Sequence, residues 1–149
     1  MLLDFAREGQ FDCFMLAGRY TLLDQTALGE LLPECVERGI SVILASVFNS
    51  GILVSGSSKD TTFNYQPAPL EVKERVRRLE AVCARHGVAL PSAALQFPLA
   101  HPAAAAAVVG ARTAREFRTD FGYSAAKIPA AFWREIGQRE LVDLSAPTP

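Results

Sequence analysis

Residues 40–47 have the sequence ISVILASV, a short run of mostly β-branched and apolar side chains. A continuous apolar run of this length is typical of a strand that is covered on both faces, as in a parallel sheet. Two further runs have the same character: FDCFMLA at residues 11–17 and AAAVVGA at residues 105–111. We therefore expect three strands, and we expect the strands at 11–17 and 40–47 to be buried on both faces.

Helical periodicity separates these strands. Within residues 70–86 the apolar side chains of Val72, Val76 and Leu79 recur at helical spacing, and Gly87 follows as a helix stop. Further helices are expected at residues 2–8, 25–38, 91–99, 113–121 and 129–139, and a polar loop is expected at residues 54–69. Pro33 predicts either a kink or a late start in its helix, and Thr113 is expected to cap the next-to-last one.

Strands that alternate with helices define the fold class. They imply βαβ units, a parallel sheet and hence an α/β protein. Right-handed crossovers then place the helices on one side of the sheet. The chain of 149 residues suits one domain, and no internal repeat or domain boundary is visible in it.

The charge balance argues against a nucleic-acid or membrane partner. The sequence has 15 Lys and Arg residues against 16 Asp and Glu, a net charge of -1, and 50% of its residues are apolar. A near-neutral chain lacks the basic surface that nucleic acid requires, and its longest apolar runs are too short to span a bilayer. The basic run RVRR at residues 75–78 is expected to pair with Glu71 and Glu74 along a solvated helix face.

The cysteines favour a reducing compartment. Cys13, Cys35 and Cys83 are odd in number and show no C-x-x-C spacing, so neither a disulfide framework nor a metal site is expected. Cys35 and Cys83 fall in the apolar rows of expected helices, and we expect both to be buried. The N-terminal sequence MLLDFAREG lacks the basic region and cleavage site of a signal peptide, so we expect a cytoplasmic location.

Two strand-to-helix turns carry small residues and glycine: SVFNSGI at residues 46–52 and VVGARTAREF at residues 108–117. In α/β proteins the loops at the carboxyl ends of the strands hold the ligand. A glycine lets the backbone approach a phosphate, and Arg112 or Arg115 can add a charge-assisted hydrogen bond. The same residues also suit ordinary strand-helix connections, so the pattern by itself leaves phosphate binding open.

Four stretches together resemble the aldo-keto reductase superfamily: FDCFMLAGRYTLLDQTAL, RGISVILASVFNSGIL, RLEAVCARHGVALPSAALQFPLAHP and AVVGARTAREF. They are most similar to its sugar 1-dehydrogenase branch, which includes D-threo-aldose and L-fucose dehydrogenases. The resemblance implies a (β/α)8 TIM barrel that binds NADP or NAD in extended form. Residues 1–149 would form a single partial domain, the C-terminal half-barrel that contributes about strands six to eight with their helices.

The resemblance also implies two cofactor-binding segments. The loop after strand seven would wrap the pyrophosphate, and the loop and helix after strand eight would contact the adenosine. The residues implied are Ser46, Val47, Phe48, Asn49, Ser50, Gly51 and Leu53 in the first segment, and Gly110, Ala111, Arg112, Thr113, Glu116 and Asp120 in the second. The sequence departs from the family pattern at Ala45 and Ser46, where many members carry an aromatic residue, and at Thr119 and Asp120, where Glu-Asn is usual.

The resemblance implies no catalytic residue in this chain, because the family's Asp, Tyr, Lys and His tetrad lies in the first half of the barrel. Tyr20 follows a strand and either lines the substrate pocket or packs in the core. Tyr65 lies in the expected polar loop, either as a lid or in local packing. His86 ends a helix, where a positive charge is favourable, and His101 is expected at the surface.

The implied reaction is the oxidation of an aldose, such as L-fucose or D-threo-aldose, at C1 to the lactone with NADP or NAD. This chain would carry the cofactor-binding half. The alternative is a noncatalytic nucleotide-binding or oligomerising half-barrel. Strands without their barrel neighbours leave edges and apolar surface exposed, so we expect self-association or pairing with an N-terminal half.

Overall fold

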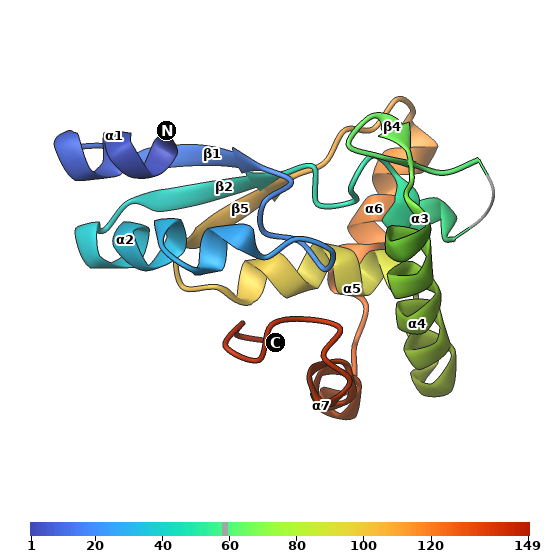
Figure 1. Cartoon of the computed structure of the whole chain (residues 1–149). Helices are drawn as coiled ribbons and strands as arrows, with labels where there is room; N and C mark the ends of the chain where they lie inside the picture. Colours follow the sequence, from blue (N-terminus) through green and yellow to red (C-terminus); the bar gives the residue numbers. More distant parts are fainter. Residues whose placement is uncertain (58–59) are drawn as a thin grey trace.

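A computed structural model describes residues 1–57 and 60–149 of the chain. Three parallel strands form the central sheet in the order β1-β2-β5, with β1 at Cys13–Ala17, β2 at Ser41–Ala45 and β5 at Ala104–Val108 (Figure 1). The expected α/β class with parallel strands is confirmed. All three strands are shorter than the apolar runs that predicted them.

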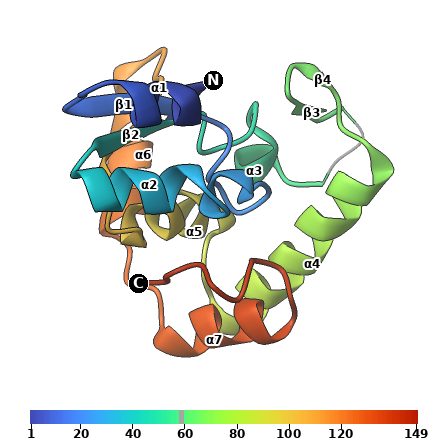
Figure 2. The ribbon, with the colours of Figure 1, turned by 60° about the vertical axis from the view of Figure 1, so that its left-hand side comes forward.

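Helices occupy the connections between the strands and the C-terminal part of the chain. The helices of the described residues are α1 (Leu2–Glu8), α2 (Leu31–Arg38), α3 (Ile52–Ser55), α4 (Leu70–His86), α5 (Leu90–Gln96), α6 (Ala114–Ala125) and α7 (Ala130–Gln138), with short 3-10 helices η1 (Thr26–Leu28) and η2 (Phe97–Ala100). Figure 2 shows α4 and α7 side by side, away from the strands. None of these helices is long and apolar enough to cross a membrane.

Pro33 is expected either to kink its helix or to delay the start of the helix, and the first residue of α2 shows which of these occurs. η1 precedes α2, and α2 begins only at Leu31, so the late start is the outcome observed. Pro33 thus lies in the first turn, where its missing N–H leaves no intrahelical hydrogen bond unmade. Gly39 ends the helix with a φ of 68°, a left-handed conformation that glycine adopts without a steric cost.

The expectation of a loop at residues 54–69 is wrong for part of its described length, which contains regular structure. The last residues of α3 fall within it, and β3 (Thr62–Phe63) pairs with β4 (Gln66–Pro67) as an antiparallel hairpin. Ser58 and Lys59, which also belong to the expected loop, lie outside the described residues. The hairpin lies near the carboxyl ends of β2 and β5, beside the groove that is described below.

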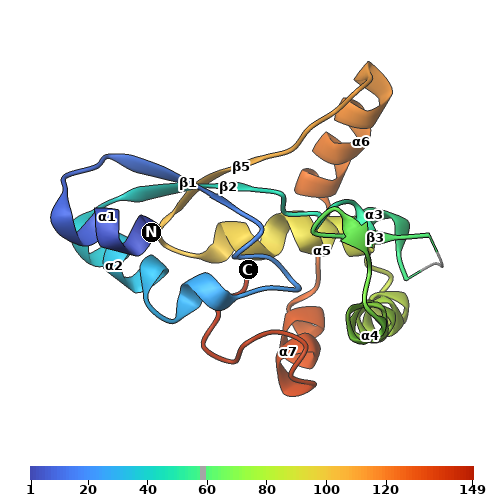
Figure 3. The same ribbon diagram turned by 45° about the horizontal axis from the view of Figure 1, so that its top comes forward.

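Helices cover one face of the sheet, as the handedness of the crossovers predicts (Figure 3). Phe14, Leu16, Val42 and Leu44 point to this face and are buried. Side chains of opposite parity point to the other face, where Met15 is 60% exposed. The expectation that both faces are buried is wrong for this chain, because no described element lies over the second face.

The basic run of α4 forms its expected pairing only in part: Arg77 pairs with Glu74, whereas no pair joins Arg75 to Glu71 among the described residues. The Arg75 guanidinium instead donates hydrogen bonds to the backbone oxygens of Leu23 at 3.1 Å and of Leu141 at 2.7 Å. These bonds tie α4 to the loop after β1 and to the C-terminal segment. Burial is the main cause that lowers the pKa of Arg75, and the neighbouring positive charge of Arg78 lowers it further.

Cys35 and Cys83 are buried, as expected. Both lie on the apolar faces of their helices, α2 and α4. Burial raises the pKa of both thiols, that of Cys83 to about 11. A buried thiol with a raised pKa stays protonated and packs as a small apolar side chain.

Candidate functional site

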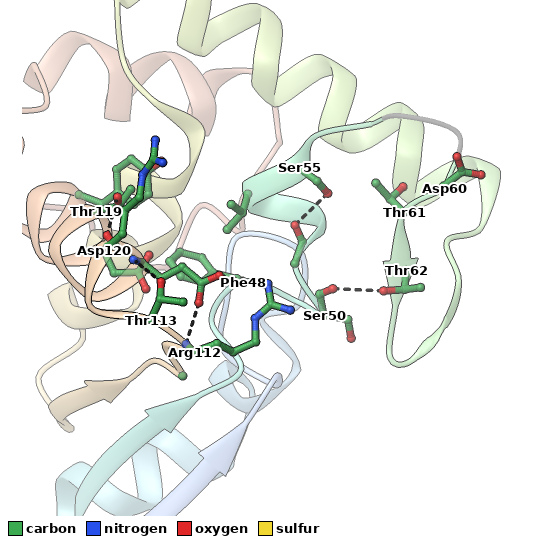
Figure 4. Close-up of a pocket in the computed structure, with 16 residues that line it drawn as sticks. Phe48, Ser50, Ser55, Asp60, Thr61, Thr62, Arg112, Thr113, Thr119 and Asp120 are labelled. Atoms are coloured by element: carbon green, nitrogen blue, oxygen red, sulfur yellow. Dashed lines mark hydrogen bonds and ion pairs between the residues drawn. The ribbon is translucent and has the colours of Figure 1, made fainter.

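A groove of about 690 Å³ lies at the carboxyl ends of β2 and β5. The loop after β2 and the β3–β4 hairpin form one wall, and α6 with the segment before it forms the other (Figure 4). Its described lining residues are Phe48, Ser50, Gly51, Val54, Ser55, Asp60, Thr61, Thr62, Gly110, Arg112, Thr113, Arg115, Glu116, Thr119, Asp120 and Tyr123. The groove thus brings together the two segments that the sequence assigns to a cofactor.

The loop after β2 is held in an unusual backbone conformation. Ser46, Asn49 and Ser50 have φ values of 56°, 47° and 58°, in the left-handed region that few residues other than glycine adopt. Gly51 follows with a φ of 92°, where a side chain would be strained. Such conformations cost about 1–3 kcal/mol each and are typical of ligand-binding loops.

The hairpin holds this strained loop in place. The Thr62 hydroxyl donates a hydrogen bond to the Ser50 backbone oxygen at 3.1 Å (Figure 4). The Tyr65 backbone N–H donates to the Ser50 hydroxyl, also at 3.1 Å. Ser50 is therefore fixed through both its backbone and its side chain. Tyr65 takes part through its backbone while its ring stays exposed.

Part of the same loop faces the core instead of the groove. Val47, Asn49 and Leu53 are buried and do not line the groove. Asn49 is 2% exposed, and neither polar atom of its side-chain amide has a hydrogen-bond partner within residues 1–57 and 60–149. A buried amide without a partner costs about 1–3 kcal/mol. Asn49 thus lies between Phe48 and Ser50, two residues that do line the groove.

A capping interaction organises the opposite wall. The Thr113 hydroxyl accepts a hydrogen bond from the Glu116 N–H at 3.1 Å, so the cap expected from the sequence is confirmed. The Glu116 carboxylate accepts from the Arg112 N–H at 2.7 Å and from the Arg112 guanidinium at 3.0 Å. The Arg112 backbone N–H is the main cause that lowers the pKa of Glu116. Glu116 therefore stays ionised and holds Arg112 against the wall.

Some residues of the two predicted segments line the groove, and others do not. Phe48, Ser50, Gly51, Gly110, Arg112, Thr113, Glu116 and Asp120 line it, whereas Ser46, Val47, Asn49, Leu53 and Ala111 do not. Ala111 lines a second, apolar hollow beside α6. The hairpin residues Thr61 and Thr62 were missed, because a polar stretch without periodicity carries no sign of which strand end it lies against.

Tyr20 packs in the core, one of the two placements left open for it. It is 1% exposed, and its ring lies 5.5 Å from that of Phe97 and 5.3 Å from that of His101. Burial is the main cause that raises the pKa of Tyr20 to about 12, and its hydroxyl has no hydrogen-bond partner in the described part of the chain. His101 is buried beside it, so the expected surface position of His101 is wrong. Burial lowers the pKa of His101.

His86 contributes to a charged cluster that joins α4 to α7, far from the groove. Its Nε2 lies 2.7 Å from the Glu135 carboxylate, which also pairs with Arg85 and, at 2.6 Å, with Arg139. These hydrogen bonds, that from Arg85 first, lower the pKa of Glu135 to about 2. No described group of three or more His, Cys, Asp or Glu side chains is arranged to hold a metal ion.

Comparison with known proteins defines the class. The model of the aldo/keto reductase family matches residues 2–139. The chain belongs to this family. The fold agrees, since the holo form of an aldo-keto reductase from Bacillus halodurans superposes with a TM-score of 0.70 at 19% identity, over 98% of this chain and 47% of that one. The chain thus corresponds to about half of a family barrel.

The curated relatives are more specific. D-threo-aldose 1-dehydrogenase from a Pseudomonas species is 41% identical over 96% of this chain and 43% of its own length. Pyridoxal 4-dehydrogenase from Microbacterium luteolum is 38% identical over 93% of this chain and 41% of its own length. This chain therefore spans less than half the length of either relative.

Proposed function

We propose that this chain is the cofactor-binding part of an NAD- or NADP-dependent oxidoreductase. The observation that carries the proposal is the groove, which joins two segments some sixty residues apart in the chain at the carboxyl ends of two parallel strands. Ligand sites of α/β proteins lie at this end of the sheet. The groove volume of about 690 Å³ falls within the range of about 300–1,000 Å³ that is usual for small-molecule and cofactor sites.

The residues of the groove fit such a cofactor. Gly51 and Gly110 line it, and a Cβ added at either position would meet no atom within 4 Å, so their backbones are open to a close approach. Arg112 and Thr113 line the opposite wall beside Gly110 and offer polar groups to the adenosine end of the cofactor. In the loop after β2, the side-chain amide of Asn49 has no hydrogen-bond partner among the described residues.

In this proposal the two walls of the groove bind different parts of the cofactor. Ser50 and Gly51, fixed by the hairpin, hold the pyrophosphate, while Gly110, Arg112 and Thr113 position the adenosine end. When bound, the nicotinamide cofactor supplies the acceptor for the two electrons of the oxidation. The residues of this chain bind and orient it, and the acid-base group comes from the remainder of the barrel.

The substrate class follows from the relatives. Since a D-threo-aldose 1-dehydrogenase is 41% identical to this chain, we propose that the complete barrel oxidises an aldose at C1 to the lactone. D-threo-aldoses and L-fucose are the sugars to test first. Activity requires the part of the barrel that the relatives have and this chain does not span. The chain alone is expected to bind nucleotide without turnover.

Filling the groove tests the proposal. Gly110→Leu places a side chain into the groove without a clash in the fold, and Gly122→Leu is the matched control on α6, outside the groove and equally free of close atoms. NADH and NADPH are titrated against each variant by nucleotide fluorescence and calorimetry. We expect Gly110→Leu to weaken the better nucleotide at least ~10-fold, which corresponds to about 1.4 kcal/mol.

Gly122→Leu should bind nucleotide as the wild type does, and both variants should keep the wild-type circular dichroism spectrum. The proposal fails if the wild type binds neither nucleotide. It fails equally if Gly110→Leu binds as tightly as the wild type.

A further inference from the structure

The charged side chains of the groove do not suit a strongly anionic ligand group. Among the described residues that line it, Asp60, Glu116 and Asp120 are acidic, whereas Arg112 and Arg115 are basic. The acidic residues thus outnumber the basic ones. A 2′-phosphate, the group that distinguishes NADP from NAD, carries close to two negative charges at neutral pH and needs a positive surplus where it binds.

The Arg112–Glu116 pair neutralises one of the two positive charges that would otherwise attract this phosphate. The Glu116 carboxylate lies 3.0 Å from the Arg112 guanidinium and 2.7 Å from its backbone N–H. The carboxylate therefore accepts from the Arg112 backbone N–H and from one nitrogen of its guanidinium, and it places a negative charge beside the remaining guanidinium donors. The Arg112 side chain is otherwise 91% exposed, so no packing forces it into this pair. A phosphate could bind there only by displacing the carboxylate or by lying against it.

A ribose with a free 2′-hydroxyl has the opposite relation to the same group. A hydroxyl donates a hydrogen bond to a carboxylate, and such a charge-assisted bond is about twice as strong as a neutral one. The pKa of Glu116 is lowered, chiefly by the Arg112 N–H, so its carboxylate is ionised throughout the neutral range and stays an acceptor. One side chain thus favours the hydroxyl and repels the phosphate.

We propose that Glu116 makes this groove select NAD over NADP. The inference rests on the proposed function, because it requires that the groove bind a nicotinamide dinucleotide with its adenosine end at α6. It extends that function by naming the cofactor and the residue that discriminates. Arg112 then acts as a partner that holds Glu116 in place, and it becomes a phosphate ligand only when the charge of Glu116 is removed.

The test compares the affinities for NADH and NADPH, measured by calorimetry, in the wild type and in Glu116→Gln. The glutamine oxygen can still accept from the Arg112 N–H, so the local structure is kept while the charge is lost. We expect the wild type to bind NADH at least ~10-fold more tightly than NADPH, about one good polar interaction. In Glu116→Gln the ratio should move at least ~10-fold toward NADPH, because NADPH gains affinity while NADH loses its charge-assisted hydrogen bond.

Two further variants sharpen the result. Adding Arg112→Ala to Glu116→Gln should abolish the gain in NADPH affinity, because the freed guanidinium is what binds the phosphate. Asp120→Asn removes an equal charge from the same wall, and it should shift the ratio much less than Glu116→Gln does. An equal shift in Asp120→Asn would overturn the assignment of selectivity to Glu116.

The outcomes separate this inference from the function on which it depends. Binding of neither nucleotide to the folded wild type overturns the proposed function, and the inference with it. Binding of both nucleotides with a preference for NADPH, or with a ratio that Glu116→Gln leaves unchanged, overturns the inference alone. Circular dichroism of each variant establishes that the sample that is titrated keeps the helix content of the wild type.

Discussion

The two faces of the β1–β2–β5 sheet differ sharply. On the face toward the helices, Phe14, Leu16, Val42 and Leu44 are buried and belong to the hydrophobic core. On the opposite face, Met15 is 60% and Val108 48% exposed, and the other positions are mostly small residues. Both faces come from the same short strands, and their side chains alternate along each strand. One face is therefore complete within this chain, and the other is not.

The difference between the two faces indicates that the open face is a surface for contact with a further part of a barrel. The relatives are more than twice as long as the part that this chain matches. β1 and β5 each pair only with β2 among the described strands, so both edges of the sheet lack a partner. We propose that the open face and these edges are covered by an N-terminal half of the barrel or, in its absence, by a second copy of the chain.

The largest expected effect comes from truncating neighbours on opposite faces of β1. Leu16→Ala removes a buried side chain and leaves a cavity, which should lower the free energy of unfolding by about 2–5 kcal/mol. Met15→Ala, one position away on the open face, should change it by less than about 0.5 kcal/mol. Urea denaturation followed by circular dichroism measures both. Equal losses in the two variants would show that the open face is already packed in this chain.

The next effect concerns association. Each exposed apolar side chain of this size costs about 1.5–3 kcal/mol relative to burial, so the isolated chain should associate at micromolar concentration. Met15→Lys places a charge on the open face and should shift the chain toward monomer in light scattering. Leu70→Lys is the control, since Leu70 is even more exposed than Met15 but starts α4, away from the sheet.

A different result would contradict this account of the open face. If the wild-type chain is a monodisperse monomer that melts cooperatively and binds no hydrophobic dye, the sheet needs no further cover. The comparison of the two faces would then describe an asymmetric but self-sufficient domain.

Local signals predicted the parts of the fold that depend on neighbouring residues. The period of apolar residues and Gly87 located α4 to the residue, and Thr113 located the start of α6. The alternation in β1 and β2 was missed because apolar side chains occupy both parities, so the sequence carries no mark of the open face. Burial depends on which elements exist to cover a strand, and a strand's own residues do not record that.

These local signals could not predict contacts between residues that are far apart in the sequence. The buried position of His101 depends on Tyr20, about eighty residues earlier, and the hold of the hairpin on Ser50 depends on Thr62 and Tyr65. The guanidinium of Arg75 reaches backbone oxygens that no spacing rule connects to it. In the candidate site, the two segments were predictable from their motifs, whereas the hairpin wall and the Arg112–Glu116 pair required the structure.

The smallest effect tests the charged cluster that joins α4 to α7 on the covered side of the molecule. Glu135 has a pKa of about 2 in the folded chain and an ordinary value near 4.5 when unfolded. Because the folded value is the lower one, the stabilisation by Glu135 is fully present above pH 4.5 and is lost as the pH falls toward 2.

The melting temperature of the wild type should therefore fall more steeply over this range than that of Glu135→Gln. At neutral pH the variant should melt lower, because Arg85 and Arg139 lose their shared carboxylate. Glu37→Gln, at an exposed position of α2, should follow the wild type at every pH. If Glu135→Gln and the wild type have parallel profiles, the cluster contributes no stability to the covered side, and that side depends on its apolar packing alone.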